Sequence, residues 1–418
     1  MVQQELSSAF SAITAENGGH PSHLPLKSLD ARPQVKPVSD LLPVHEMNAR
    51  LDLIEVVQTN IAVLRPDRPL NHIQFCYLVG MPLGDLQALA HLPSLLVVDA
   101  VHELGKLTAY CNLQADKYFD PSYTGTPSIR SQGSPRTEPD QHRCMVTGLA
   151  NPQACHIVPF HWNQDQEHVE KTTKLLKTVQ TVAFEHRTVN ASKTLMEITK
   201  DAKSSDMPWN LLCLMPQLYT WWGKAYFGFK YHDATLCKDD PSYSIISLQF
   251  VWMPCNVKAL ATEQVDLAAQ RNPLTALGSY LSHRYGQGPL SACTARDCTK
   301  CRETLGVKCH DISSNRPIDS GTIVKVRRLT KHRVLFEHVI KLQWSVLCAA
   351  AMSGGAQIYD DELLSDSEDY PCGSVPEQQD LEESEEELKE AGENSRQASI
   401  EKVESWLQQS ESADDMGT

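Results

Sequence analysis

The 418-residue sequence lacks the segments that would place it outside the cell or in a membrane. Its start has no basic stretch followed by an apolar run, so no secretory signal is predicted. No run of about 18 apolar residues occurs either. The nearest, 86–101, is interrupted by Gln87, His91, Pro93 and Asp99. We therefore expect an intracellular protein, nuclear or cytoplasmic, with no membrane partner.

Positive charge is also scarce. Lys and Arg number 38 against 52 Asp and Glu, which gives a formal net charge of −14. Residues 359–418 hold 20 acidic residues and only three basic ones, a net charge of −17, so the other 358 residues carry 35 basic and 32 acidic groups. That body is nearly neutral at +3. Nucleic-acid binding is permitted, but a strongly basic, dedicated DNA-binding domain is not indicated.

The acidic C-terminal tail, 359–418, has the composition of a disordered segment. It is typical of a solubilising tail, yet other roles stay open. Ser365 and Ser367 lie among acidic residues, a context that resembles the sites of acidophilic kinases. The tail could also bind a protein partner, or cover a cationic groove of the body as a DNA mimic.

An even, closely spaced set of cysteines is missing as well. The 13 cysteines are odd in number and scattered, which favours reduced thiols or a metal site over a disulfide framework. Cys298 and Cys301, with Cys293, Cys309 and His310 near them, could close a structural zinc site. The other spacings are irregular, so a loop with free thiols is the alternative.

The apolar content of 41% is sufficient for a sizeable core. Composition shifts predict five regions: a flexible lead-in over 1–42, a helical N-terminal region over 43–115, a linker over 116–142, a domain of mixed helix and strand over 143–358 with a helical insertion over 165–203 and a Cys-rich loop over 291–310, and the tail. Periodicity predicts helices over 44–64, over 83–110 with a break near Pro93, over 262–285 and over 334–352, and strands over 243–253 and 323–326.

Three short segments carry candidate chemistry: CMVTG (144–148), CHIVP (155–159) and WNLLC (209–213). The turn-rich residues between the first two predict a β-hairpin with His156 on its second strand and Asn210 opening a helix. Hydrolysis of a phosphodiester requires a base that activates water and a cation that stabilises developing charge. His156 could be that base, although a lone histidine is more often a core or surface residue and Asn210 could simply cap a helix. The cysteines of the first two segments are expected to pack inside the hairpin.

In their order and context these segments resemble the fungal HNH-nuclease-domain proteins, whose core is a ββα-metal finger. The resemblance continues through WNLLCLMPQLYTWWGKAYFGFK to the apolar stretch LQWSVLCAAAMSGGA (342–356), and covers mainly 143–357 apart from insertions. It implies an α+β fold with an HNH-like core embedded in helices. It also implies His156 as general base, Asn210 as the residue that orients it or supports the metal, a divalent metal such as Mg²⁺ or Zn²⁺, and nucleic acid as partner.

The sequence departs from that family at two positions. The family's last His, a metal ligand, lies nine residues after the Asn, where this chain has Tyr219, and the Asp expected four residues later is Gly223. A phenol with a pKa near ~10 is a poor substitute for imidazole on Mg²⁺ or Zn²⁺. His161 and His232 are other imidazoles, but their spacing favours neither. Two hypotheses follow: a metal-dependent nuclease weakened by Tyr219, or a catalytically degenerate scaffold with a binding or accessory role in a fungal pathway.

A basic run, Lys325 to Arg333, concentrates five positive charges in nine residues. Such a run could be a nuclear-import signal or a strip that contacts phosphates. It could also be the solvated face of a strand.

Overall fold

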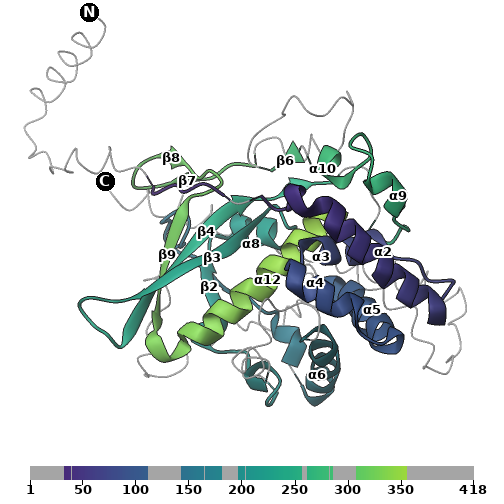
Figure 1. The fold of residues 1–418 in the computed structure, drawn as a ribbon. Helices are drawn as coiled ribbons and strands as arrows, with labels where there is room; N and C mark the ends of the chain where they lie inside the picture. Colours follow the sequence, from purple (N-terminus) through teal and green to yellow (C-terminus); the bar gives the residue numbers. More distant parts are fainter. Residues whose placement is uncertain are drawn as a thin grey trace, which may run out of the picture. The chain divides into compact units, whose positions relative to one another are not determined.

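The computed structural model of the chain, shown in Figure 1, describes residues 33–38, 40–111, 143–163, 165–180, 196–202, 204–256, 261–281, 283–285 and 307–354. These residues combine helices and strands, which confirms the predicted α+β class. All of them belong to the first of two units into which the chain divides, Met1–Ser365. The second unit, Asp366–Thr418, lies outside the described residues, as do the predicted linker over 116–142 and the acidic tail.

The N-terminal part is helical, as predicted. After the 3-10 turn η2 (Val44–Glu46) it contains α2 (Met47–Leu64), α3 (His72–Gly80), α4 (Leu83–Ala90) and α5 (Ser94–Cys111). The predicted break near Pro93 separates α4 from α5. Helix α3 was not predicted; it begins with a capping box, in which the N–H of Gln74 donates to Asn71 Oδ1 at 2.9 Å and the N–H of Asn71 donates to Gln74 Oε1 at 3.0 Å.

The main sheet is antiparallel, with the order β3 (Phe227–Leu236), β4 (Tyr243–Trp252) and β9 (Ile323–Leu329). The predicted strands in β4 and β9 are confirmed, whereas β3 was not predicted. A short segment, 33–38, follows the sheet at its β9 side: Val35 bridges Thr322, and the N–H of Ile323 donates to the carbonyl of Gln34 at 2.7 Å. We call this segment the strap.

Helix α12 (Arg333–Ser353) follows β9 through the 3-10 turn η7 (Thr330–His332) and packs against β3, α3 and α5, between the sheet and the N-terminal helices (Figure 1). It ends at Gly354 in the left-handed conformation, with φ 75°. Among the described residues, Thr330–Ser353 is the stretch long and apolar enough to cross a membrane, and 56% of its most apolar window is buried inside the protein. Its apolar side chains therefore serve the core.

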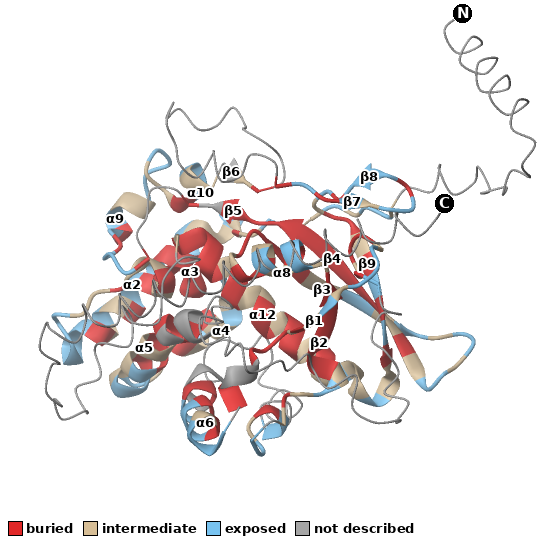
Figure 2. Ribbon diagram, turned by 180° about the vertical axis from the view of Figure 1, so that it is seen from behind, coloured by how far each residue is buried: buried red, intermediate tan, exposed pale blue. Residues whose placement is uncertain are grey.

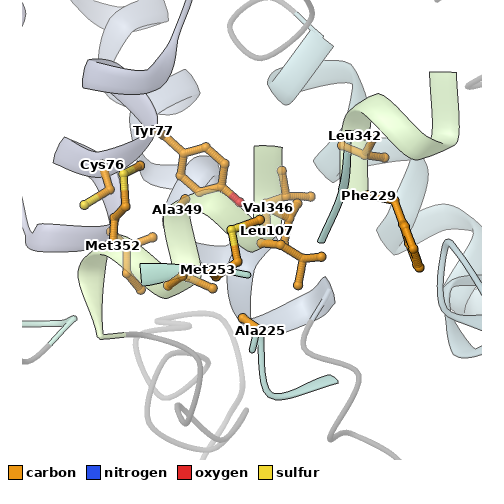
Figure 3. Packing of buried hydrophobic residues seen from close by; sticks show 14 of the residues in the cluster. Cys76, Tyr77, Leu107, Ala225, Phe229, Met253, Leu342, Val346, Ala349 and Met352 are labelled. Atoms are coloured by element: carbon orange, nitrogen blue, oxygen red, sulfur yellow. The ribbon is translucent and has the colours of Figure 1, made fainter. Parts of the chain in front are cut away.

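One continuous core joins these elements. In Figure 3, Ala349 and Met352 of α12 lie beside Cys76 and Tyr77 of α3. Strand β2 and the inner parts of β3 and β4 are buried (Figure 2). The N-terminal helices and the C-terminal helix thus exclude water together, so removal of either would expose apolar surface of the other.

The helix predicted over 262–285 is wrong. The chain there forms two single helical turns, α9 (Leu267–Gln270) and α10 (Leu277–Tyr280). Two short strand pairs lie before, within and after this stretch: β5 (Pro254–Cys255) pairs with β6 (His283–Arg284), and β7 (His310–Asp311) pairs with β8 (Arg316–Pro317). Pro273 lies between the two turns and has no N–H to donate, which breaks the helix. In the predicted insertion, helix α6 (Gln166–Gln180) follows the 3-10 turn η5 (Phe160–Asn163).

Candidate functional site

The ββα finger is present, but its strands differ from those predicted. Strand β1 (Gln153–His156) pairs antiparallel with β2 (Leu211–Leu214), so that His156 lies opposite Leu211. The predicted hairpin between 144–148 and 155–159 is wrong. Residues 144–148 instead close a turn in which the N–H of Gly148 donates to the carbonyl of Cys144 at 2.8 Å. That turn contacts the other edge of β2, where the N–H of Met145 donates to the carbonyl of Cys213 at 2.9 Å.

Helix α8 (Pro216–Gly223) completes the finger and packs against β1 and β3. Its tryptophans contact aromatic rings of the sheet: the centroids of Trp222 and Phe229 lie 5.9 Å apart, and those of Trp221 and Trp252 lie 6.2 Å apart. Such tilted and edge-on pairs add to the apolar burial at this interface. The finger is therefore fixed on the inner face of the main sheet.

Asn210 is fully buried and holds two backbone segments together. It ends the 3-10 turn η6 (Pro208–Asn210) directly before β2, so the prediction that it opens a helix is wrong. Its Nδ2 donates to the carbonyls of Val158 at 2.9 Å and Ser205 at 3.1 Å, and its Oδ1 accepts from the N–H of Val158 at 2.8 Å. Both amide hydrogens are used on backbone carbonyls. Of the two roles that the resemblance implied for Asn210, this geometry favours orientation over support of a metal.

His156 contacts a carboxylate that the sequence reasoning missed. Its Nε2 lies 3.2 Å from Oδ1 of Asp206, and the two side chains are 19% and 37% exposed. A carboxylate at Nε2 favours the tautomer with the proton on that nitrogen, and so directs the basic lone pair to Nδ1. The signal for this residue was an acidic side chain four positions before Asn210, which no local rule connects with His156.

Buried polar side chains hold the turn that carries Asp206. Ser205 donates from Oγ to Oδ1 of Asn163 at 2.5 Å, and Nδ2 of Asn163 donates to the carbonyl of Ile198 at 3.0 Å. Because Asn210 binds Ser205 and Val158, one amide fixes the residue before Asp206 and the second residue after His156. The pair is therefore positioned by backbone contacts on both sides.

Tyr219 lies on α8, partly buried, with its side chain packed against the core. Its backbone N–H donates to the carbonyl of Met215 at 3.0 Å. Gly223 ends the same helix and is buried.

His232, one of the two other imidazoles, lies on β3, where its Nε2 is 2.6 Å from Nζ of Lys36 in the strap. The side chain of His161 is not among the parts of the chain that the structure describes.

The predicted cysteine sites divide between described and undescribed residues. Cys298 and Cys301 lie outside the described residues, so the zinc site remains a prediction. Cys309 is buried, and this burial, with the neighbouring Cys144 and Asp319, raises the pKa of its thiol to about 12. Cys144 and Cys155 are both buried in the core, as expected for packing residues.

The divalent metal implied by the resemblance does not fit the residues that the structure describes. Within them no group of three or more His, Cys, Asp and Glu side chains is arranged to hold a metal ion. Both amide hydrogens of Asn210 are donated to backbone carbonyls, so this side chain does not add to a ligand set. We therefore derive no catalytic step through a metal.

Comparison with known proteins supports the HNH-like character of the finger. Residues 144–230 match a family model, HNH_2, described as HNH endonuclease. The match includes β1, the Asp206 turn, β2 and α8. No curated protein and no solved structure matches the chain. The finger is thus similar to HNH endonucleases, and the N-terminal helices and α12 lie outside the matched residues.

Proposed function

We propose that this protein is an HNH-nuclease-like protein that binds nucleic acid through the finger and its surroundings, with metal-dependent cleavage strongly weakened. One observation carries the proposal. The hydrogen bonds of the Asn210 side chain to Val158 hold the finger's backbone together, while the described residues supply no set of metal ligands.

The two halves of that observation have different chemical consequences. Cleavage of a phosphodiester builds charge on the phosphoryl and leaving oxygens, and the cation of a metal-dependent nuclease stabilises it. A neutral phenol at Tyr219 supplies neither that charge nor an imidazole ligand. Binding is less demanding, because phosphates are held by Lys and Arg without a resident metal. Arg143, directly before the finger, and Lys331, after β9, are exposed cations of the body.

The experiment compares binding with cleavage in the full chain. Fluorescence anisotropy with labelled single-stranded and duplex DNA and RNA, in EDTA, measures metal-independent binding at a stated salt concentration. Plasmid nicking with Mg²⁺, Mn²⁺ or Zn²⁺ measures cleavage by the wild type, by His156→Ala and by Tyr219→His. We expect binding in EDTA, no or very weak nicking by the wild type, and no recovery in Tyr219→His, because one new imidazole does not complete a ligand set.

Two outcomes would contradict the proposal. Strong nicking by the wild type that His156→Ala abolishes would make the protein an active nuclease. Failure to bind any of the four nucleic acids would remove the nucleic-acid partner and leave a role as a protein-binding scaffold. Equal nicking by wild type and His156→Ala would indicate a contaminating nuclease and requires repeated purification before either conclusion.

A second candidate is residual hydrolysis, and the His156–Asp206 contact favours it. A histidine whose Nε2 is held by a carboxylate can accept a proton from water at Nδ1, while Asp206 stabilises the imidazolium that forms. In this role Asp206 is a positioning residue. Asp206→Asn should then lower any weak nicking activity about as strongly as His156→Ala. Asp201→Asn, a nearby exposed replacement of the same kind, should not change it.

A further inference from the structure

The basic run Lys325 to Arg333 does not form one charged strip. Lys325 and Arg327 are exposed, whereas Arg328 is only 3% exposed. Successive residues of a strand point to opposite faces, so Arg327 and Arg328 project from opposite sides of the sheet. The two outward cations fit the predicted solvated face. Arg328 points into the core, on the face that carries the finger.

Arg328 connects three elements there. Its Nη2 donates to the carbonyl of Leu211 in β2 at 2.8 Å. Its Nη1 donates to the carbonyl of Arg327 in its own strand at 2.8 Å, and its guanidinium carbon lies 5.0 Å from the ring centroid of Phe336 in the first turns of α12. The planar, forked guanidinium allows one side chain to make all three contacts.

The contact with Leu211 lies next to the candidate site. Leu211 is the residue opposite His156 in the β1–β2 pair, and the N–H of Ile157 donates to the carbonyl of the preceding Asn210 at 2.8 Å. Asn210 therefore secures one side of this corner of the finger, and Arg328 secures the carbonyl of the adjoining residue. Leu211 is 6% exposed, so water does not readily replace the guanidinium as a donor.

We propose that Arg328 is a positioning residue, which fixes the start of β2 against the main sheet and thereby holds His156 in place. Its charge is not displayed to a ligand. The positioning itself is argued from contacts alone, while its effect on nucleic-acid binding rests on the proposed function.

Hydrogen exchange of single backbone amides, measured by NMR on the full chain, tests the positioning. The variants are Arg328→Met, which keeps an unbranched apolar side chain without the guanidinium donors, and Arg328→Lys, which keeps a positively charged donor group. The matched control is Arg327→Met, which removes the same charge one residue earlier on the exposed face. The reporter amide is Ile157, and the reference amide is Phe75 in α3, which donates to the carbonyl of Asn71.

The expected result is local. In Arg328→Met, Ile157 should exchange about tenfold faster relative to Phe75, because loss of one buried hydrogen bond shifts a local opening by that order. Arg328→Lys should recover part of the protection, and Arg327→Met should exchange like the wild type. Parallel acceleration of Ile157 and Phe75 would mean general destabilisation, and an unchanged Ile157 would mean no role; either result overturns the proposal. If Arg328→Met does not fold, the exchange rate of Ile157 relative to Phe75 in Arg328→Lys decides: a local acceleration supports the proposal, and an unchanged ratio overturns it.

Binding measured on the same variants separates the two proposals. Arg328→Met should weaken nucleic-acid binding while Arg327→Met changes it only slightly. A wild type that binds no nucleic acid but shows the local exchange effect would refute the proposed function and leave the positioning role standing. Binding that falls only in Arg327→Met would instead support the phosphate-contacting strip and count against Arg328.

Discussion

Asn210 holds Val158 by both of its backbone groups: Oδ1 accepts from the N–H at 2.8 Å, and Nδ2 donates to the carbonyl at 2.9 Å. A side-chain amide thus replaces a neighbouring strand where β1 ends. The resemblance implied that Asn210 orients the base or supports a metal. In the structure it binds the backbone of Val158, the second residue after His156. Its chemistry is that of a buried amide whose loss leaves several backbone groups without partners.

We expect Asn210→Ala to be one of the most destabilising substitutions in the finger. It removes three hydrogen bonds and leaves buried groups of Val158 and Ser205 unsatisfied, which should cost about 3 kcal/mol of unfolding free energy. Urea unfolding measures it. Asn60→Ala is the control, since Asn60 donates a single half-buried bond to the carbonyl of Ala90 and should cost about 1 kcal/mol. An equal loss of unfolding free energy in the two variants would show that the extra hydrogen bonds of Asn210 add no stability.

Gly321 is required where the strap meets the sheet. Its φ is +99°, and a Cβ atom there would collide with the backbone carbonyl of Lys36, whose N–H donates to the carbonyl of Gly321 at 2.9 Å. Gly321→Ala should therefore destabilise the protein by about 2 kcal/mol through backbone strain and close contact. It should also make the strap more sensitive to limited proteolysis.

The control for Gly321 is Gly84→Ala, in helix α4, where nothing lies within 4 Å of an added Cβ. Alanine is the better helix former, so this variant should be neutral or more stable by about 0.5 kcal/mol. Thermal unfolding distinguishes the two substitutions. A Gly321→Ala protein as stable as the wild type, with an equally resistant strap, would show that the strap does not require glycine at this position.

The sequence was most informative where local pattern decides structure. Helix α2, the break at Pro93 and strand β4 follow from periodicity and breakers within a few residues. Strand β3 was missed because its inner half is buried and its outer half exposed, so it shows no single alternation. The helix over 262–285 was wrongly predicted from its apolar spacing, although Pro273 within this stretch indicates a helix break.

The candidate site was predictable only in part. The resemblance identified His156 and Asn210, and the structure brings them together because β1 pairs with β2. That pairing joins segments more than fifty residues apart, whereas the predicted hairpin relied on the nearest turn signal. Asp206 and Arg328 could not be found in this way, because their significance comes only from tertiary contacts with His156 and Leu211.

Arg50 connects the start of α2 to the end of α3, and its loss should be costly. It is 5% exposed, binds Glu46 with Nη2 at 2.8 Å, and donates from Nη1 to the carbonyls of Val79 and Met81. Arg50→Met should lower the free energy of unfolding by about 3 kcal/mol, because a partly buried carboxylate and two carbonyls lose their donor.

Arg271→Met is the comparison for Arg50. Arg271 pairs with Asp52 and Glu55 on the exposed surface, at 2.6 and 2.9 Å. Exposed ion pairs are screened by water and salt, so this variant should leave the urea midpoint nearly unchanged. If the exposed variant proves as destabilised as Arg50→Met, burial is not what makes Arg50 important.

The stability of the protein should fall as the pH drops from about 7 to about 5, the range in which histidine titrates. Burial lowers the pKa of His332 below its usual 6.5, and the charges of Lys331 and Arg328 lower it further. Above 6.5 the side chain is neutral in both states; below it the unfolded chain binds the proton more readily, which favours unfolding. His332→Gln should flatten this dependence in thermal unfolding, because the replacement cannot bind a proton in this range. An unchanged slope in His332→Gln would contradict the assignment.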